Sequence, residues 1–401
     1  MAARIVVLGG SFAGLTAAFK LKRDLGDQAE VTVVARDPRF VFIPSLIWVV
    51  PGWRKPGQIS FDLEPALRRH GIDFMHAVAE QIEPAQNVLK TDRGDVGYDY
   101  LVIASGPRYD WSVVPDLGPA DGTTWSVCNL PHAMEAAKAW LDFVQDPGPV
   151  VIGSTQGASC FGAEYEVAFN IDRALRQAKI RKQAPLTFFT AEPFLGHFGI
   201  GGMRGGEAML KGYFRLLGID AIANVSTTAV SADSITLSTG RELPKKYAIV
   251  IPPFTGVQAI LDSDGVGDAR GFVPVNDRYQ HQSFANIYAA GVAVQVKPPQ
   301  PTEVPTGVPK TGWMSEVMAK VAAHNVAAAI TGGPPLEKPF GDIRPLCIMD
   351  AGTQGMIIGL DRVFKPRKFE LMIPGPWSHW AKLGFEHYYM TKMRYGLVQL
   401  P

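Results

Sequence analysis

Cysteine is scarce in this chain, whose 401 residues include three, at Cys128, Cys160 and Cys347. So few thiols exclude the disulfide framework that stabilises small secreted domains, and an odd number leaves at least one thiol free. An isolated cysteine is usually a small buried hydrophobe. The residues around each thiol must therefore decide between packing and chemistry.

Long apolar runs and net charge are also lacking. No run of about 18 uncharged apolar residues occurs, which predicts no membrane-spanning helix. The first apolar strand begins at Arg4, which leaves no room for a signal peptide. The net charge of +1 gives no attraction to nucleic acid, so we expect no such partner, and we expect no metal site. The length exceeds the roughly 250 to 300 residues at which a single core stops growing, which predicts two or three domains.

The chain begins with the pattern of a dinucleotide-binding unit. Residues 4–8 predict a buried strand, and residues 9–14, GGSFAG, predict a glycine turn that opens a helix ending at Gly26. Such a turn lets a pyrophosphate approach the backbone at the helix N-terminus. The pattern departs from the usual one at Ser11, which holds the middle glycine position. The next strand, 31–35, also ends without the acidic residue expected to bind a ribose.

A second strand and glycine turn occur at residues 149–157 and lead into a helix expected at 163–175, with later strands at 186–189 and 247–251. In a relative that uses NADH this unit would bind the nicotinamide cofactor. Here the turn runs directly into Cys160, at the opening of the helix, where the helix dipole stabilises a thiolate. We therefore predict that the nicotinamide site has been given up.

Two further segments resemble those of flavoprotein disulfide reductases and their relatives. Residues 98–106, YDYLVIASG, are similar to the segment that lies beneath the flavin nucleotide, and residues 284–291, FANIYAAG, to the late strand whose end meets the flavin pyrophosphate. One position departs from the family pattern, because Val292 stands where an aspartate is usual. Together with the first turn, these segments imply a discontinuous FAD-binding domain.

A closer resemblance, to the bacterial type of sulfide:quinone oxidoreductase, covers essentially the whole chain. Its segments are GASCFGAEYE at 157–166, EPFLGHFGI at 192–200, PTGVPKTGWM at 305–314, and FKPRKFE at 364–370 after Cys347. The implied fold is α/β with two Rossmann-like domains. The implied divisions are an FAD-binding domain at 1–113 and 255–335, a second Rossmann-like domain at 114–254, and a C-terminal amphipathic helical region at 336–401.

The resemblance implies that hydrogen sulfide is oxidised to sulfane sulfur or polysulfide, with electrons passing through FAD to ubiquinone or another membrane quinone. Cys160 and Cys347 would be the redox pair on the sulfide side. Cys128 matches an auxiliary cysteine that bonds covalently to the flavin in some relatives. Hydrosulfide suits such a site because it can open a sulfur–sulfur bond by exchange, which leaves one sulfur persulfidated and the other a free thiolate.

Several titratable residues match positions that carry protons or charge in this family. His132 and His197 resemble its acid–base histidines, although an ordinary hydrogen-bonded or surface histidine is the alternative. Glu166 is either a proton acceptor or, more simply, a local structural carboxylate. Lys310 resembles the lysine near the reducible edge of the flavin, and a solvated loop lysine is the alternative.

The resemblance also implies contact positions for the two aromatic ligands. For FAD these are Gly9, Ser11, Phe12, Ala13, Gly14, Ala35, Arg36, Pro44, Ala79, Ala104, Ser105, Gly106, Gly291, Val292 and Lys310. For quinone they are Phe42, Pro44, Gly312, Ile348 and Phe385. Ile348 departs from the family, in which an aromatic residue often walls the quinone.

The C-terminal residues 376–395 have the pattern of a helix lying in a membrane interface. An aromatic face is formed by Trp377, Trp380, Leu383, Gly384, Tyr388 and Tyr395, with Lys382, Lys392 and Arg394 near it. The alternative is a terminal helix docked on the protein's own core. We expect a monotopic protein on the cell membrane, by default on the cytoplasmic face, that binds the membrane surface. The sequence leaves a monomer and a homo-oligomer open.

Two other functions fit the same residues. A sulfide-oxidising flavoprotein could deliver electrons to a cytochrome subunit, although such proteins usually carry a signal peptide. A flavin-binding redox sensor could use the cysteines as a switch without turnover. Single-subunit NADH:quinone reductases share the superfamily, so the fold is more firmly implied than the substrate.

Overall fold

The computed structural model describes residues 2–120 and 122–400 and contains two parallel sheets, each the centre of a Rossmann-like unit. The first sheet has the strand order β19-β9-β1-β2-β5, and all of its pairings are parallel. Its strands are β1 (Ala3–Leu8), β2 (Ala29–Ala35), β5 (Asp73–His76), β9 (Tyr100–Ile103) and β19 (Ile287–Ala289). The late strand therefore returns to the sheet that the N-terminus begins.

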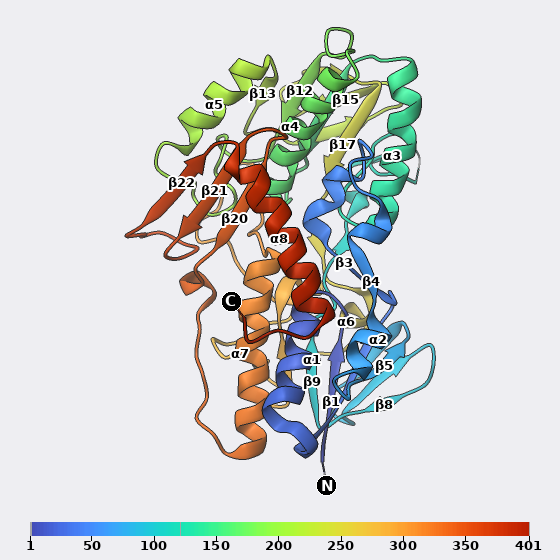
Figure 1. Ribbon diagram of the computed structural model, residues 1–401, viewed down its shortest axis with the longest axis vertical. Coiled ribbons are helices and arrows are strands. Elements are labelled where there is room, and N and C mark those ends of the chain that lie inside the picture. The colour runs from blue at the N-terminus through green and yellow to red at the C-terminus, as the bar shows by residue number, and fades with distance from the viewer. Residues whose placement is uncertain (1, 121, 401) are drawn as a thin grey trace.

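The first sheet is covered by two packed helices, α1 (Phe12–Leu25) and α7 (Gly312–Thr331) (Figure 1). Apolar residues of β1 are buried because helices and neighbouring strands enclose a parallel strand on both faces. Helix α1 ends, as predicted, at Gly26, whose φ of 56° favours glycine.

The second parallel sheet has the order β13-β12-β11-β17. Its strands are β11 (Val150–Ser154), β12 (Leu186–Phe189), β13 (Asp220–Ile222) and β17 (Tyr247–Ile251). Three helices belong to the same unit, α3 (Leu130–Gln145), α4 (Phe161–Gln177) and α5 (Gly206–Leu217). The expected strands at 186–189 and 247–251 are confirmed, and α4 is longer at both ends than the expected 163–175.

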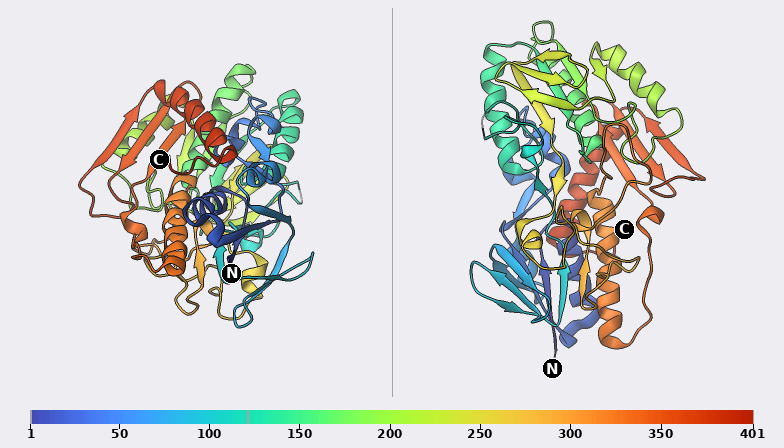
Figure 2. Two further views of the ribbon diagram at one scale, coloured as in Figure 1. Left: turned by 60° about the horizontal axis from the view of Figure 1, so that its bottom comes forward. Right: turned by 180° about the vertical axis from the view of Figure 1, so that it is seen from behind.

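The C-terminal region forms an antiparallel sheet of three strands, β20 (Leu346–Asp350), β21 (Gly355–Leu360) and β22 (Glu370–Pro374), followed by helix α8 (Trp377–Arg394). The two parallel sheets lie towards opposite ends of the long axis, and this region lies along one side between them (Figures 1 and 2). It is therefore placed to contact both Rossmann-like units.

The remaining elements are short strands and helices that connect these units. The strands are β3 (Arg39–Val41) with β4 (Ser60–Asp62), β6 (Ala79–Glu83) with β7 (Val88–Thr91) and β8 (Val96–Gly97), β10 (Arg108–Tyr109) with β18 (Phe254–Thr255), and β14 (Thr227–Val230) with β15 (Ser234–Leu237) and β16 (Glu242–Pro244). The helices are α2 (Leu63–Arg68) and α6 (Gln258–Leu261).

Every strand of the first parallel sheet lies within 1–113 or 255–335, and every strand of the second lies within 114–254. The division of the chain into those domains remains a proposal. Across residues 2–120 and 122–400, no helix is both long and apolar enough to cross a bilayer.

Candidate functional site

The first glycine turn, residues 9–14, is a tightly packed backbone cradle. Strands β1, β9 and β19 are neighbours, so their carboxyl ends bring this turn together with residues 104–106 and Gly291. A Cβ on Gly9 would lie 2.2 Å from the carbonyl oxygen of Ala104, and one on Gly291 would lie 3.2 Å from the Cβ of Ala13. The three segments predicted to hold FAD therefore meet at one edge of the sheet.

Other predicted cofactor positions surround this cradle or lie in connecting segments. A Cβ on Gly10 would lie 3.3 Å from the Cβ of Ala35, which places the end of β2 beside the turn. The Oγ of Ser105 is buried and lacks a hydrogen-bond partner among the described residues. Arg36 forms an exposed ion pair with Asp37, at 3.1 Å. Ala79 begins β6, and Pro44 lies in a short 3-10 helix, Ile43–Trp48.

Lys310 is not a solvated loop lysine. Its Nζ donates to the carbonyl oxygens of Val292 at 2.9 Å and Val294 at 2.7 Å, and lies 4.4 Å from the ring centroid of Phe272. Burial, reinforced by the nearby Arg270, lowers the pKa of Lys310 to about 7. The lysine therefore lies beside the loop that follows β19, and its place near the reducible edge of the flavin stays a prediction.

The second glycine turn, residues 153–157, is occupied by the protein's own chain. The N–H of Gly157 donates to the carbonyl oxygen of Pro305 at 2.6 Å, and the N–H of Gly307 donates to that of Ala158 at 2.7 Å. A Cβ on Gly307 would lie 2.7 Å from the Cβ of Ser159. The backbone N–H that could face a phosphate in a nucleotide-binding turn is thus already bonded.

The three free cysteines are partly buried and lie in different elements. Cys160 is the N-cap residue of α4, Cys347 lies on β20, and Cys128 precedes the first residues of α3. Cys160 lies within electrostatic range of both other thiols. Burial raises the pKa of Cys128 to about 11 and those of Cys160 and Cys347 to about 12. The expected stabilisation of the Cys160 thiolate by the helix dipole is therefore outweighed by desolvation.

Glu166 explains why the elements that carry Cys160 and Cys347 lie together. Its buried carboxylate on α4 accepts from the N–H of Asp350 on β20 at 2.6 Å and from Nζ of Lys382 on α8 at 2.6 Å. Asn170, one turn further along α4, donates to the carbonyl oxygen of Asp350 at 2.9 Å. Burial raises the pKa of Glu166, and the Lys382 ammonium opposes that rise. The residue joins three elements that are distant in the sequence, so its structural role is not the local one expected, and a role as proton acceptor stays a prediction.

The two predicted histidines lie in separate parts of the second unit, His132 in the first turn of α3 and His197 in the loop after β12. The Nδ1 of His132 lies 3.3 Å from Oγ of Ser126, and its ring packs against Tyr109 and Trp111 with centroids 5.6 Å apart in both cases. The Nδ1 of His197 accepts from the N–H of Gly199 at 3.2 Å. Burial lowers the pKa of both histidines, which favours neutral imidazoles. Their proton-transfer roles stay predictions.

Most of the residues predicted to bind quinone belong to one aromatic cluster. Phe42 lies 6.3 Å from Phe385, and Phe12 lies 6.0 Å from Phe42, measured between ring centroids. A Cβ on Gly312 would lie 3.1 Å from the Phe12 ring. Tyr389 of α8 also contacts this cluster, with its ring centroid 4.6 Å from that of Phe385. Ile348, on β20, pairs in register with Ile357 of β21.

Helix α8 differs from the expectation in the direction of its basic residues. Lys382 and Lys392 are each 1% exposed and bond to Glu166 and Glu316 inside the protein, so the prediction that they lie near the exposed aromatic face is wrong. Trp377 and Trp380 are 53% and 72% exposed. The lysines turn inward because buried carboxylates on α4 and α7 are available to pair with them. The helix is therefore docked on the core while its tryptophans stay outside.

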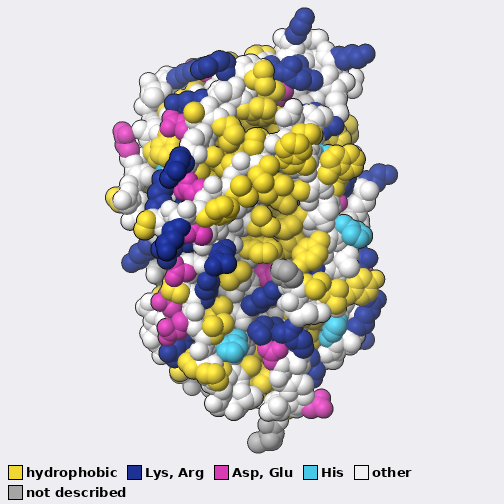
Figure 3. Space-filling view, turned by 60° about the vertical axis from the view of Figure 1, so that its left-hand side comes forward, with side chains coloured by type: hydrophobic (Ala, Val, Ile, Leu, Met, Phe, Trp, Pro, Cys, Tyr) yellow, Lys and Arg dark blue, Asp and Glu magenta, His cyan; other side chains and the backbone are white. Residues whose placement is uncertain are grey.

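The exposed tryptophans belong to a broad apolar surface. Phe369 and Leu371, which lie just before and within β22, are 53% and 37% exposed. The face turned forward in Figure 3 includes the side of the molecule that carries β22 and α8, and hydrophobic side chains gather across it. Apolar surfaces of this extent usually mark a binding partner or a membrane.

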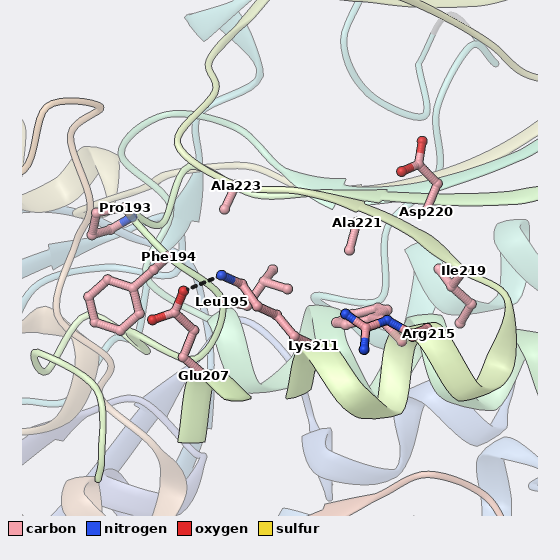
Figure 4. A pocket seen from close by; sticks show the side chains of 11 residues that line it. Pro193, Phe194, Leu195, Glu207, Lys211, Arg215, Ile219, Asp220, Ala221 and Ala223 are labelled. Carbon is pink, nitrogen blue, oxygen red and sulfur yellow. Dashed lines mark ion pairs between the residues drawn. The ribbon is translucent and has the colours of Figure 1, made fainter. Parts of the chain in front are cut away.

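A separate surface cavity of about 480 Å³ lies between α5 and β13 (Figure 4). Three of its charged lining residues are in ion pairs, because Lys211 bonds to Glu207 at 2.6 Å and Asp220 bonds to Arg241. None of the predicted site residues lines it. We assign the cavity no part in the site.

Comparison with known proteins identifies the family. A family model described as pyridine nucleotide-disulphide oxidoreductase matches residues 3–311. The sulfide-quinone reductase of Aquifex aeolicus is 36% identical over 405 residues, which cover 99% of this chain and 93% of that protein. The X-ray structure of the sulfide:quinone oxidoreductase from the same bacterium matches with a TM-score of 0.93 over 98% of this chain and 92% of the other. The chain belongs to the sulfide:quinone oxidoreductase family.

More distant members and neighbours support the same fold. The mitochondrial sulfide:quinone oxidoreductase of Dictyostelium discoideum is 23% identical over 312 residues, which cover 72% of this chain and 64% of that protein. The structure of NDH2 from Plasmodium falciparum in complex with NADH has a TM-score of 0.72 at 14% identity, covering 100% of this chain and 99% of the other. Membership of the sulfide:quinone oxidoreductase family confirms the predicted α/β fold and the predicted FAD cofactor.

The residues of the first unit fit that cofactor. Its glycines leave no room for side chains between the turn and residues 104–106, and the Ser105 hydroxyl is a buried group without a partner, as a ligand-binding position would have. Sequence reasoning missed the contributions of Glu316, Asp350 and Lys382 to the docking of α8. Each is separated from its partner by 29 or more residues, and Asp350 bonds to His379 of α8, so local spacing gives no signal for the pairing.

Proposed function

We propose that this protein oxidises hydrogen sulfide to sulfane sulfur or polysulfide and transfers the electrons through FAD to a membrane quinone. The observation that carries the proposal is the placement of Cys160 and Cys347. Cys160 follows a glycine turn whose Gly157 N–H is bonded to the chain's own Pro305. The carboxylate of Glu166 holds the helix that Cys160 caps against β20, the strand that carries Cys347. Two thiols so placed suit sulfur exchange, and a closed turn does not suit a nicotinamide nucleotide.

The chain's own residues would act on sulfur by exchange. Cys160 and Cys347 are free thiols in this structure, and they would first form a bridge by losing two electrons, for which bound FAD would supply the acceptor. Hydrosulfide would then attack one sulfur of that bridge, which forms one sulfur–sulfur bond and breaks another. One cysteine becomes a persulfide and the other leaves as a thiolate. The persulfide and the thiolate would then join again in a bridge that is one sulfur longer, which releases two electrons and one proton. Bound FAD would supply the two-electron acceptor between this step and quinone. Cys128 is an auxiliary thiol in this scheme.

The histidines and Lys310 suit the movement of protons and charge. His132 and His197, with pKa values lowered by burial, are neutral near pH 7 and can accept a proton released from hydrogen sulfide. Lys310, bonded to the loop after β19, would place a cation beside the flavin when its amine is protonated.

Helix α8 links the quinone cluster with the exposed apolar face. Phe385 and Tyr389 contact Phe42 on the inner side of the helix, whereas Trp377 and Trp380 are exposed. A lipid-soluble acceptor could then reach the cluster from a bilayer on which the tryptophans rest. Peripheral attachment to the cell membrane follows, with the cytoplasmic face as the default.

The test separates the two half-reactions. Replacing both Trp377 and Trp380 by Ala should lower liposome binding and quinone reduction by about tenfold, because the exposed tryptophans that rest on the bilayer would be gone. A tenfold change in affinity corresponds to about 1.4 kcal/mol. Sulfide should still reduce the flavin in this variant. The control is Leu141→Ala on α3, which removes a 68% exposed apolar residue away from this face. Unchanged flotation with liposomes would contradict the membrane role, and failure of sulfide to reduce the flavin of the unmodified protein would contradict the function.

A further inference from the structure

Glu192, one of the buried acids of the second Rossmann-like unit, has no place in the proposed sulfur chemistry. It follows β12, the second strand of that unit, just where a dinucleotide-binding unit commonly carries an acid that bonds a ribose. Here the side chain is 0% exposed. Its carboxylate therefore faces the protein interior and is not available to a nucleotide.

The carboxylate of Glu192 is bonded to the loop that carries His197. Its Oε1 accepts from the N–H of Phe198, and its Oε2 accepts from the hydroxyl of Tyr165 at 2.5 Å. The same Tyr165 hydroxyl accepts from the N–H of Gly196 at 2.8 Å. The two backbone N–H groups that flank His197 are therefore held, one directly and one through Tyr165, by the carboxyl group of a single buried residue.

The backbone of this loop is one that needs such support. Phe198 has a φ of 54°, in the left-handed region that bulky side chains rarely adopt, and Gly196 and Gly199 on either side have φ values of 83° and 68°. A strained residue of this kind persists only where its surroundings determine its conformation. The Phe198 ring also packs against Tyr165, with centroids 5.3 Å apart.

We propose that Glu192, with Tyr165, is the positioning residue that fixes His197 for the reaction with sulfide. In this role the acid that follows β12 bonds to the protein's own loop and not to a nucleotide. The proposal rests on the proposed function in one respect, the proton-transfer role of His197. Glu192 does not contact the reacting sulfur. It acts through the backbone on both sides of the histidine.

The experiment is a double-mutant cycle on the FAD-loaded protein, read out as the rate of flavin reduction by sulfide across pH. His197→Ala should slow reduction by about 100-fold, the lower end of the range for general acid–base catalysis. Glu192→Gln should slow it by about tenfold and should alter the pH profile. In the His197→Ala background, Glu192→Gln should cause no further loss, because the group it positions is gone.

Two further variants guard against a purely structural effect. Tyr165→Phe keeps the packed ring but removes the hydroxyl between Glu192 and Gly196, so it should reproduce the Glu192→Gln rate. If the Glu192→Gln variant does not fold, the rate of Tyr165→Phe takes its place in the test. Asp172→Asn removes another buried acid of α4, bonded to Arg176 and Arg181 at 2.7 and 2.5 Å, away from the loop. It should lower the melting temperature while leaving the pH profile unchanged.

The outcomes distinguish the inference from the function on which it rests. If the effects of Glu192→Gln and His197→Ala multiply, or if Asp172→Asn alters the pH profile equally, Glu192 is a general structural residue and the inference is overturned. If His197→Ala reduces its flavin at the wild-type rate, both the role of His197 and the inference fail. If sulfide does not reduce the flavin of the unmodified protein, the proposed function itself fails.

Discussion

The two glycine turns of this protein have similar sequences and different surroundings. The first, residues 9–14, meets the ends of β9 and β19 at one edge of its sheet and belongs to the FAD-binding unit. The second, residues 153–157, donates the N–H of Gly157 to Pro305 and leads into Cys160. A strand, a glycine turn and a helix thus specify a backbone geometry. What the turn binds depends on which groups of the chain fill the space in front of it.

The largest expected effect comes from removing the chemistry that we assign to the second turn. Cys160→Ser and Cys347→Ser should each lower the rate of sulfide-dependent flavin reduction by about 10³-fold or more, as loss of an essential nucleophile does. FAD should remain bound in both variants because the first turn is unaltered. Stopped-flow absorbance of the flavin measures the rate. Cys128→Ser is the matched control and should lose less than about tenfold. A wild-type rate in Cys160→Ser would show that the second glycine turn does not serve sulfur chemistry through Cys160.

The next effect tests the junction that brings the two thiols together. Lys382→Met leaves the buried carboxylate of Glu166 without its cation and should cost about 4 kcal/mol of unfolding free energy, because an unpaired buried charge is strongly destabilising. Adding Glu166→Gln should restore much of that loss. Urea denaturation of the single and double variants provides the values. A double variant no more stable than Lys382→Met would mean that the pair is not coupled.

A smaller difference is expected between the glycines of the two turns. Gly14→Ala should cost about 3 kcal/mol and weaken FAD binding, because its Cβ would lie 1.9 Å from the carbonyl oxygen of Gly9. Gly157→Ala should cost about 1 kcal/mol, the strain of its φ of 78°, since its nearest neighbour is a Pro253 side chain at 3.4 Å. Thermal unfolding and flavin content distinguish them. Equal loss of flavin in both variants would remove the contrast between the turns.

The sequence predicts the first unit well because its signals are local. The glycine turn, the stop at Gly26 and the buried strand are each encoded within a few residues, and the late strand is recognisable from its resemblance to relatives. The position of Cys160 at the opening of α4 could be predicted for the same reason. Its raised pKa could not, because desolvation depends on packing from other parts of the chain.

The orientation of α8 shows where local reasoning ends. Helical spacing indicates which residues share a face, but it does not say which face turns inward when both carry aromatic and basic residues. Lys382 pairs with a carboxylate 216 positions earlier, and Lys392 with one 76 positions earlier. Those partners can be identified only in the folded protein. The exposed positions of Trp377 and Trp380 agree with the predicted aromatic face.

The central claim is that the second turn serves sulfur and not a nicotinamide. Its most direct test is a single-turnover comparison in which the same FAD-loaded protein is mixed with sulfide or with NADH and the flavin absorbance is followed. We expect rapid loss of oxidised flavin with sulfide. With NADH the rate should be at least about 100-fold lower, because the Gly157 N–H already donates to Pro305 and is not free to donate to a phosphate. Reduction by NADH as fast as by sulfide would contradict it.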